Sequence, residues 1–289
     1  MFHQQLEKYS RLIENHLAQL SLGEGSLKES MNYSLQAGGK RIRPVLALAS
    51  AKALGGEIEN ILDPVCALDL IHTYSLIHDD LPSMDNDDYR RGKLANHKVF
   101  GDGQAILAGD ALLTYAFELL SKEIPGVAPE RQLRVIREVA QAAGPSGMVG
   151  GQVRDLEAEN KRLNLEELEA VHRMKTGAML VVSARLGAIL VNGSEEDIQA
   201  LTKYAQAIGL AFQIKDDLLD IEGDSETLGK LAQSDLRQNK STYPTLLGVE
   251  GAKIELKAKI QEAYKAIEPL GGRGNFLRSL AEYIAQRSH

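Results

Sequence analysis

The chain has 289 residues, of which 44% are hydrophobic and 25% charged, and this composition excludes an intrinsically disordered protein. Its formal net charge of −7 argues against nucleic-acid binding, which usually requires a basic surface. The single cysteine, Cys66, excludes an intramolecular disulfide and a multi-cysteine metal site. Because Met1 to Leu12 contains no apolar signal segment and no apolar run is long enough to span a bilayer, we expect a cytoplasmic protein without a transmembrane segment.

Helical periodicity dominates the chain, whereas alternating β-branched and polar residues are scarce. The first clear pattern runs from Pro44 to Leu54, with a proline in the first turn and Gly55 after the last. The second runs from Ile61 to His78 and has one broad apolar face. Further helices are predicted at Asp102 to Leu120, Glu130 to Ala143, Leu165 to Val191, Glu195 to Ile221 and Ala252 to Ile267. The connections are too short to be domain linkers, so the sequence predicts an all-α protein in which residues 1–289 form a single domain.

A cluster of carboxylates follows the helix predicted at Ile61 to His78. It reads Asp-Asp-Leu-Pro-Ser-Met-Asp-Asn-Asp-Asp over residues 79–88. Pro82 disfavours a helical conformation at Leu81, so the cluster lies where the helix is expected to end.

A second acidic cluster lies within the helix predicted at Glu195 to Ile221. At spacings of i, i+3, i+4 and i+7, one polar stripe of this helix consists of Gln213, Asp216, Asp217 and Asp220. Stacked like charges destabilise a helix, and a hard divalent cation would offset them. Mg²⁺ typically takes one or two carboxylates together with phosphate oxygens. A solvated helix face and the acid/base carboxylate pair of a glycosidase remain open at this point, whereas the spacing of an EF-hand calcium loop is absent.

Basic clusters accompany the acidic ones. Residues 38–44 read Gly-Gly-Lys-Arg-Ile-Arg-Pro, and backbone N–H groups at a helix start with cations beside them suit a phosphate. Two acidic clusters with several basic ones fit two diphosphates bridged by metal ions, since a glycosidase needs no cations and a nucleic-acid-binding protein needs no carboxylates. His72 lies seven residues before Asp79, and therefore on the same helix face. The other basic residues of interest are Arg90, Arg91, Lys93, Lys175, Lys230 and Lys240.

These motifs, together with Lys175-Thr176-Gly177, resemble those of the trans-isoprenyl diphosphate synthases, and most closely those of the bacterial farnesyl diphosphate synthases. The resemblance extends from about Gly38 to the C-terminus. It implies a bundle of mostly antiparallel helices around a deep central cavity, usually in a homodimer. The implied reaction is the head-to-tail condensation of isopentenyl diphosphate with dimethylallyl or geranyl diphosphate, with three Mg²⁺ ions per active site.

The resemblance also implies a role for individual residues. The expected Mg²⁺ ligands are Asp79, Asp85, Asp216 and Asp220, with Asp80 and Asp217 in or near the same shell. The allylic diphosphate is expected to contact Arg90, Lys175, Lys230 and Lys240. Isopentenyl diphosphate is expected to contact Lys40, Arg43, His72 and Arg91. Thr176 and Gln213 are expected to direct their dipoles toward the allylic carbon.

Product length is expected to depend on residues four and five places before the first motif aspartate, which are Ser75 and Tyr74 in this chain. The ring of Tyr74 predicts that growth stops at fifteen carbons, with geranylgeranyl diphosphate as the alternative product. The chain departs from the family pattern at Asn86, where another aspartate is common, and at Leu94 to His97, which replaces Pro-Thr-Cys-His.

Two other functions are compatible with parts of the pattern. A terpene cyclase or head-to-head synthase shares the fold and the aspartate motifs, but it has no use for the isopentenyl diphosphate site at residues 38–44. A catalytically silent subunit of a prenyl synthase would be expected to lack a motif aspartate, and both motifs are intact here.

Overall fold

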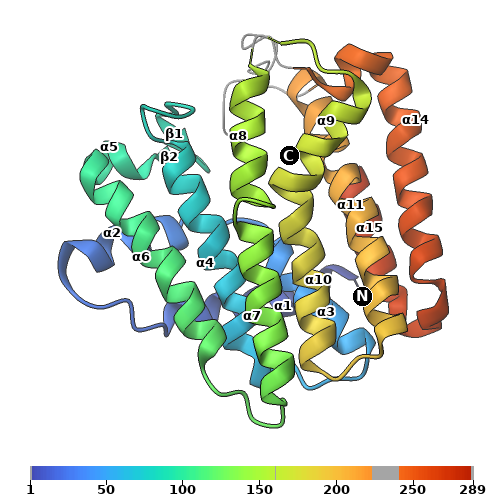
Figure 1. Cartoon of the computed structure of the whole chain (residues 1–289), viewed down its shortest axis with the longest axis horizontal. Coiled ribbons are helices and arrows are strands. Elements are labelled where there is room, and N and C mark those ends of the chain that lie inside the picture. The colour runs from blue at the N-terminus through green and yellow to red at the C-terminus, as the bar shows by residue number, and fades with distance from the viewer. Residues whose placement is uncertain (1, 160, 223–240, 288–289) are drawn as a thin grey trace.

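The computed structural model describes residues 2–159, 161–222 and 241–287, and it is a bundle of helices with one short β-hairpin (Figure 1). The predicted all-α fold is confirmed. The first half of the chain contains α1 (Phe2–Ala18), α2 (Gly25–Leu35), α3 (Ile42–Ala53), η1 (Glu59–Ile61), α4 (Leu62–Asp79), β1 (Tyr89–Arg90), β2 (Lys93–Leu94), α5 (Asn96–Phe100), α6 (Asp102–Ser121) and α7 (Pro129–Ala143). The second half contains α8 (Met148–Ala158), α9 (Leu165–His172), η2 (Arg173–Gly177), α10 (Ala178–Leu190), α11 (Glu195–Glu222), α14 (Tyr243–Ala266), η3 (Glu268–Gly274) and α15 (Asn275–Gln286).

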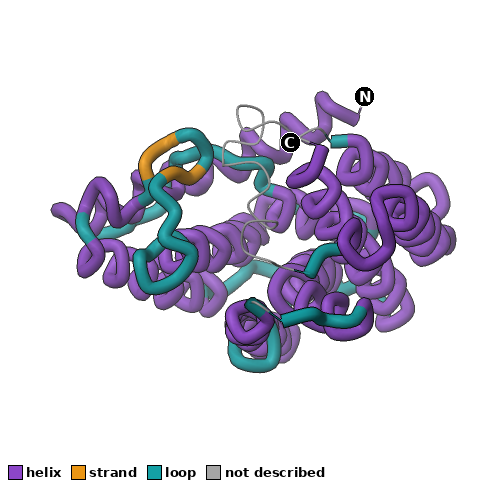
Figure 2. The backbone as a smooth tube through the Cα atoms, turned by 90° about the horizontal axis from the view of Figure 1, so that it is seen from above, coloured by secondary structure: helices purple, strands orange, loops and turns teal. Residues whose placement is uncertain are grey.

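The longer helices pack in a continuous series. Helix α6 lies on α4, α4 on α3, α3 on α10, and α10 on α11, which in turn contacts α14 and α15. Seen from above in Figure 2, most of these helices are viewed along their axes. The β1–β2 hairpin, antiparallel with Tyr89 opposite Leu94, lies at the end of the bundle where α4 finishes (Figure 1).

Helices α3 and α4 are buried on nearly all sides because their sequences are almost continuously apolar. In α4, Leu68, Leu70 and Ile71 are fully buried, and each such side chain contributes about 1.5–3 kcal/mol to folding. The crossing of α3 and α10 is especially close at Gly187. A Cβ atom at this position would lie 2.0 Å from the carbonyl oxygen of Ala47, so only glycine allows the two backbones to touch.

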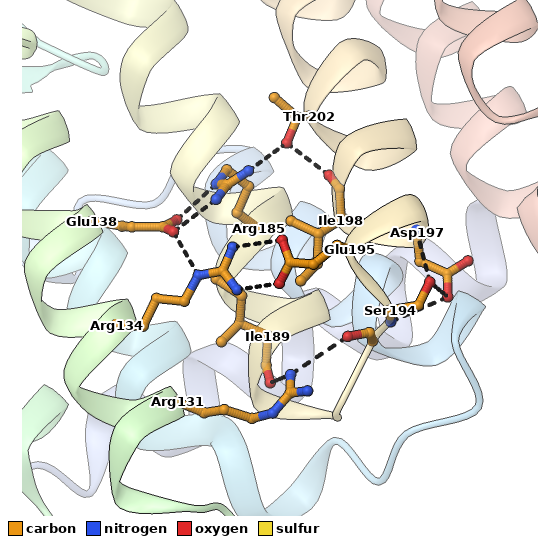
Figure 3. A network of polar contacts seen from close by, with 11 residues as sticks. Arg131, Arg134, Glu138, Arg185, Ile189, Ser194, Glu195, Asp197, Ile198 and Thr202 are labelled. Carbon is orange, nitrogen blue, oxygen red and sulfur yellow. Dashed lines mark hydrogen bonds and ion pairs between the residues drawn. The ribbon is translucent and has the colours of Figure 1, made fainter.

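A network of ion pairs holds α7, α10 and α11 together (Figure 3). Both Arg185 Nε and Arg185 Nη2 donate to Glu138 at 2.7 Å, and Arg185 Nη1 donates to Thr202 Oγ1 at 2.9 Å. Arg134 bonds to the same Glu138 at 3.0 Å and also to Glu195. These contacts hold α10, the helix that follows η2, against α7 and α11.

Several helix boundaries differ from the prediction. The run predicted at Leu165 to Val191 is divided into α9, the π-helical turn η2 and α10. Helix α14 begins at Tyr243 rather than Ala252, because the chain continues through a non-helical Gly248 (φ 73°). Helix α3 begins at Ile42, two residues before the predicted Pro44. Within the part of the chain that is described, no helix is both long and apolar enough to cross a membrane.

Candidate active site

The first acidic cluster lies at the C-terminal end of α4, where the chain turns back on itself. The N–H of Asp85 donates to the carbonyl of Asp79 at 2.9 Å, which closes the turn after Pro82. Asp80 is only 2% exposed and accepts a hydrogen bond from Arg90 Nε at 2.9 Å. The hairpin therefore carries Arg90 back onto the carboxylates that precede it.

The buried surroundings of Asp79 disfavour its carboxylate form. Burial raises the pKa of Asp79 to about 6, even though Lys175 and Arg90 lower it, and Asp85 and Asp80 raise it further. Lys175 of the π-helical turn η2 is therefore within the electrostatic reach of Asp79 at the end of α4, although the two are far apart in sequence.

The loop before α3 and the hairpin form a second, cationic group. Arg91 donates to the carbonyl of Gly38, and a Cβ at Gly39 would lie 2.7 Å from the Arg91 guanidinium carbon. Burial, followed by Arg43 and Arg91, lowers the pKa of His72 well below its ordinary value, so its ring is neutral. Burial together with nearby Arg287 lowers the pKa of Lys40 to about 8. The structure therefore brings these predicted residues together around one interior region: Lys40, Arg43, His72 and Arg91.

Arg41, between Lys40 and Arg43, has a structural role. It adopts a left-handed conformation (φ 47°) as the residue before α3 and is 6% exposed. Its guanidinium bonds to Asp69 on α4 and to the carbonyl of Leu35, both at 2.6 Å. Arg41 thus anchors the basic loop to α4.

Lys175 and Thr176 lie in the π-helical turn η2, a geometry that is often found at functional sites. Lys175 Nζ bonds to Asp155 of α8 at 2.7 Å. A Cβ at Gly151 of α8 would lie 2.3 Å from the backbone nitrogen of Lys175, so the glycine allows α8 and η2 to approach closely. The π-helical turn is therefore held from behind by α8.

The second acidic cluster lies on α11, as predicted, and each of its first two carboxylates contacts a different part of the chain. Asp216 bonds to Arg287, just after α15, at 2.8 Å. Asp217 is buried and accepts the N–H of Tyr243, the first residue of α14, at 2.8 Å. Asp220 is also buried. Gln213 Nε2 lies 3.5 Å from His172 Nδ1.

Four side chains of this region were missed by the sequence analysis: Gln152, Asp155, His172 and Arg287. Each is a lone polar residue without a repeating pattern, so no sequence signal singled it out. Burial lowers the pKa of His172 to about 4, and its ring stacks on Tyr243 with centroids 5.8 Å apart. Both amide atoms of Gln152 are buried without a hydrogen-bond partner in the described chain.

The remaining predicted residues are two lysines late in the chain and the two residues expected to determine product length. Lys230 and Lys240 fall outside the described residues. Tyr74 is 6% exposed and packs edge-on against His78 with centroids 5.7 Å apart, while Ser75 Oγ donates to the carbonyl of His72 at 2.9 Å. Burial and then Asp79 raise the pKa of the Tyr74 hydroxyl, so this hydroxyl is within the electrostatic reach of the first acidic cluster.

A separate groove of about 1100 Å³ runs between α10, α11 and α14. It contains none of the predicted site residues. The candidate site is therefore identified by the convergence of acidic and basic side chains and not by the size of a cavity.

The carboxylates present suit Mg²⁺. Among residues 2–159, 161–222 and 241–287, no three or more His, Cys, Asp or Glu side chains converge into a metal cage. Mg²⁺ does not need one, because it commonly takes one or two carboxylates and completes its shell with water and phosphate oxygens. Burial is the main cause of the raised pKa of Asp79, and a bound cation would favour the carboxylate form of this side chain.

Residues 24–270 match the polyprenyl synthetase family, and the chain belongs to that family. Among its curated relatives is a farnesyl diphosphate synthase of Bacillus subtilis, 51% identical over 91% of this chain and 90% of that protein. A chloroplastic geranylgeranyl pyrophosphate synthase of Capsicum annuum is 48% identical over 91% of this chain and 72% of its own length. Among solved structures, an FPP/GFPP synthase from Zymomonas mobilis has a TM-score of 0.87 at 38% identity, covering 98% of both chains.

Proposed function

We propose that this protein is a farnesyl diphosphate synthase, which condenses isopentenyl diphosphate head to tail with dimethylallyl and then geranyl diphosphate. One observation carries the proposal: two acidic clusters and two cationic groups converge on one interior region. Asp79 is within the electrostatic reach of Lys175, and Asp216 is within that of Lys40 and Arg43. Such a site can hold two diphosphates side by side.

The allylic diphosphate is proposed to lie between the two acidic clusters. Three Mg²⁺ ions, held by Asp79 and Asp85 on one side and by Asp216 and Asp220 on the other, would supply Lewis-acid stabilisation of the departing diphosphate. Arg90 and Lys175 would add positive charge that is already in place when the carbon–oxygen bond breaks. Each of these cations is paired with a carboxylate, Arg90 with Asp80 and Lys175 with Asp155.

Isopentenyl diphosphate is proposed to occupy the group formed by Lys40, Arg43, His72 and Arg91. Burial holds the pKa of Arg43 at about 10, so it keeps its positive charge at neutral pH. The neutral His72 would donate or accept a hydrogen bond without adding charge. The double bond of this substrate then attacks the allylic carbon, and a proton leaves to the released diphosphate.

The allylic cation requires negative dipole ends nearby and no water, which would trap it as an alcohol. Thr176 and Gln213 are proposed to supply those dipoles. Tyr74, buried on α4 five residues before Asp79, would block growth beyond fifteen carbons. Geranylgeranyl diphosphate is the alternative product, because a geranylgeranyl pyrophosphate synthase is 48% identical to this chain.

We also propose that the whole of residues 1–289 acts as one polyprenyl synthase domain in the cytoplasm, and as a homodimer. The dimer is supported by large apolar side chains that α6 and α8 expose: Ile106, Leu107, Val149 and Val153. Leu107 is 57% exposed, so Leu107→Lys should yield a monomer in light scattering if α6 forms the interface.

The activity is tested by incubating the purified protein with Mg²⁺, radiolabelled isopentenyl diphosphate and either dimethylallyl or geranyl diphosphate. After dephosphorylation, the expected main product is a C15 alcohol that is lost on adding EDTA. An Asp216→Ala variant is the control, and it should lose most turnover while keeping its circular dichroism spectrum. A C20 product would replace the farnesyl proposal with the geranylgeranyl alternative, and no elongation with either starter would overturn both.

A further inference from the structure

The geometry points to His172 as a positioning residue that sets the orientation of the Gln213 amide, so that the amide oxygen rather than its nitrogen faces the reacting centre. The inference rests on the proposed function, because it concerns the cation that forms in that reaction. It assigns a role to a side chain that no motif of the sequence singles out.

The ring of His172 is held rigidly from one face. It lies at the end of α9, three residues before Lys175, and its side chain is 12% exposed. Its plane is within 11° of the ring of Tyr243, which is itself completely buried. The Tyr243 hydroxyl donates toward Glu169 at 3.4 Å, and its N–H donates to Asp217. The stacking partner is therefore fixed at both ends.

The carboxylate of Asp217 favours one of the two possible directions for the polar contact of this ring. Gln213 Nε2 lies 3.5 Å from His172 Nδ1. The Asp217 carboxylate lies 3.9 Å from His172 Nε2 and favours a proton on that nitrogen, although Nε2 makes no hydrogen bond within the described residues. Nδ1 then carries a lone pair and accepts from the amide nitrogen, which can only donate. A flipped Gln213 would set its oxygen against the Nδ1 lone pair, which disfavours that orientation.

The orientation of the Gln213 amide also determines where its oxygen points. With Nε2 directed at His172, Gln213 Oε1 points away from the ring, and it has no hydrogen-bond partner among residues whose positions are described. Gln213 lies one turn after Gly209, whose Cβ would be 3.3 Å from the Cα of Gly177, so the amide is on the face of α11 that contacts the turn carrying Lys175 and Thr176. A fixed oxygen there presents the negative end of a dipole to a developing allylic cation, whereas a fixed N–H would present the positive end.

The test separates the ring from its acceptor atom with two substitutions. His172→Phe keeps an aromatic ring for Tyr243 but loses the acceptor. His172→Asn loses the ring but places an oxygen close to the position of Nδ1. We expect His172→Phe to lower kcat on the order of tenfold to a hundredfold while the KM for isopentenyl diphosphate changes less than about twofold. His172→Asn should recover most of that loss in kcat.

A double-mutant cycle then asks whether His172 acts through Gln213. In a Gln213→Met background, adding His172→Phe should change kcat by less than about twofold, because the dipole to be oriented is gone. The same tenfold or greater loss in both backgrounds, or equal losses for the Phe and Asn variants, would assign His172 a merely structural role and overturn the inference.

An additional readout does not depend on turnover. In protein labelled with ¹⁵N-histidine, the resonances of residue 172, assigned by their absence in His172→Asn, should show a neutral ring with the proton on Nε2. The Nδ1 resonance should move in Gln213→Met. A proton on Nδ1 would refute the proposed hydrogen bond even if the enzyme is active. Wild-type protein that forms no C15 product would instead refute the proposed function, and the inference with it.

Discussion

Gly151→Ala is the perturbation for which the structure gives the clearest magnitude. The added Cβ would lie 2.3 Å from the backbone nitrogen of Lys175, 2.7 Å from its Cα and 2.8 Å from the carbonyl carbon of Met174. All three are backbone atoms of the π-helical turn, so no side chain can rotate away. Relief of the overlap requires α8 and η2 to separate by about 1 Å, since carbon atoms in contact lie about 3.5–4.0 Å apart.

Such a displacement moves Lys175 and Thr176 relative to the acidic clusters. A misplacement of about 1 Å can cost about a hundredfold in rate, so we expect kcat to fall by that factor. The overpacking costs about 1–3 kcal/mol of stability, partly offset by about 1 kcal/mol because alanine favours the helix more than glycine does. The melting temperature should therefore fall by only a few degrees.

The assay is the steady-state rate of C15 formation from geranyl and isopentenyl diphosphates, alongside a thermal melt. Gly272→Ala is the matched control, because its Cβ would meet only the Asn275 amide nitrogen, at 3.9 Å, and both its rate and its melting temperature should stay near those of the wild type. A Gly151→Ala protein with wild-type kcat would show that the close approach of α8 does not position the turn.

Three further predictions follow from the site and its supports. Burial raises the pKa of Asp79 to about 6, so the charge of this side chain disfavours folding above that pH. Asp79→Asn should therefore stabilise the metal-free protein at pH 8 by up to about 3 kcal/mol while abolishing turnover. Equal melting temperatures of the two proteins in EDTA would contradict this. The gain should disappear near pH 4, where Asp79 is protonated in the folded wild type. Tyr74→Ala should yield products longer than C15 on chromatography and Tyr74→Phe should not; a C15 product from both would move the length determinant elsewhere. Glu138→Gln leaves Arg185 without its carboxylate and should lower stability by about 2–3 kcal/mol in chemical denaturation, whereas Glu262→Gln on the surface should change it by less than about 0.5 kcal/mol.

The long helices were predictable because their apolar residues recur with helical spacing over several turns. Helices α4, α6, α7 and α11 lie within one or two residues of the predicted bounds. Helix α8 was missed because Gly150 and Gly151 interrupt its pattern, and it forms where packing against η2 demands glycine. The start of α14 was missed because Gly248 and Gly251 mimic a loop.

The site residues were predictable where charged side chains cluster in the sequence. They were not predictable where folding brings a charged residue from a distant part of the chain. Residues 38–44, 79–91 and 213–220 could be selected from local spacing alone. Arg287 lies 71 residues from Asp216, and Asp155 lies 20 residues from Lys175. Nothing in the local sequence of either residue records its partner. The π-helical turn was likewise invisible, because a single widened turn leaves the apolar periodicity of its helix almost unchanged.

The contact at Gly187 has a consequence for how this protein can change. Helix α3 starts just after the loop that carries Lys40, and α10 starts just after the turn that carries Lys175. Their backbones touch where Gly187 meets Ala47, so the spacing between the two proposed diphosphate positions is built into the main chain. Tyr74, the residue proposed to limit product length, belongs to α4 instead. Product length can therefore change through substitutions on α4 while the distance between the two reacting molecules stays the same. Selection can vary the first property without altering the second.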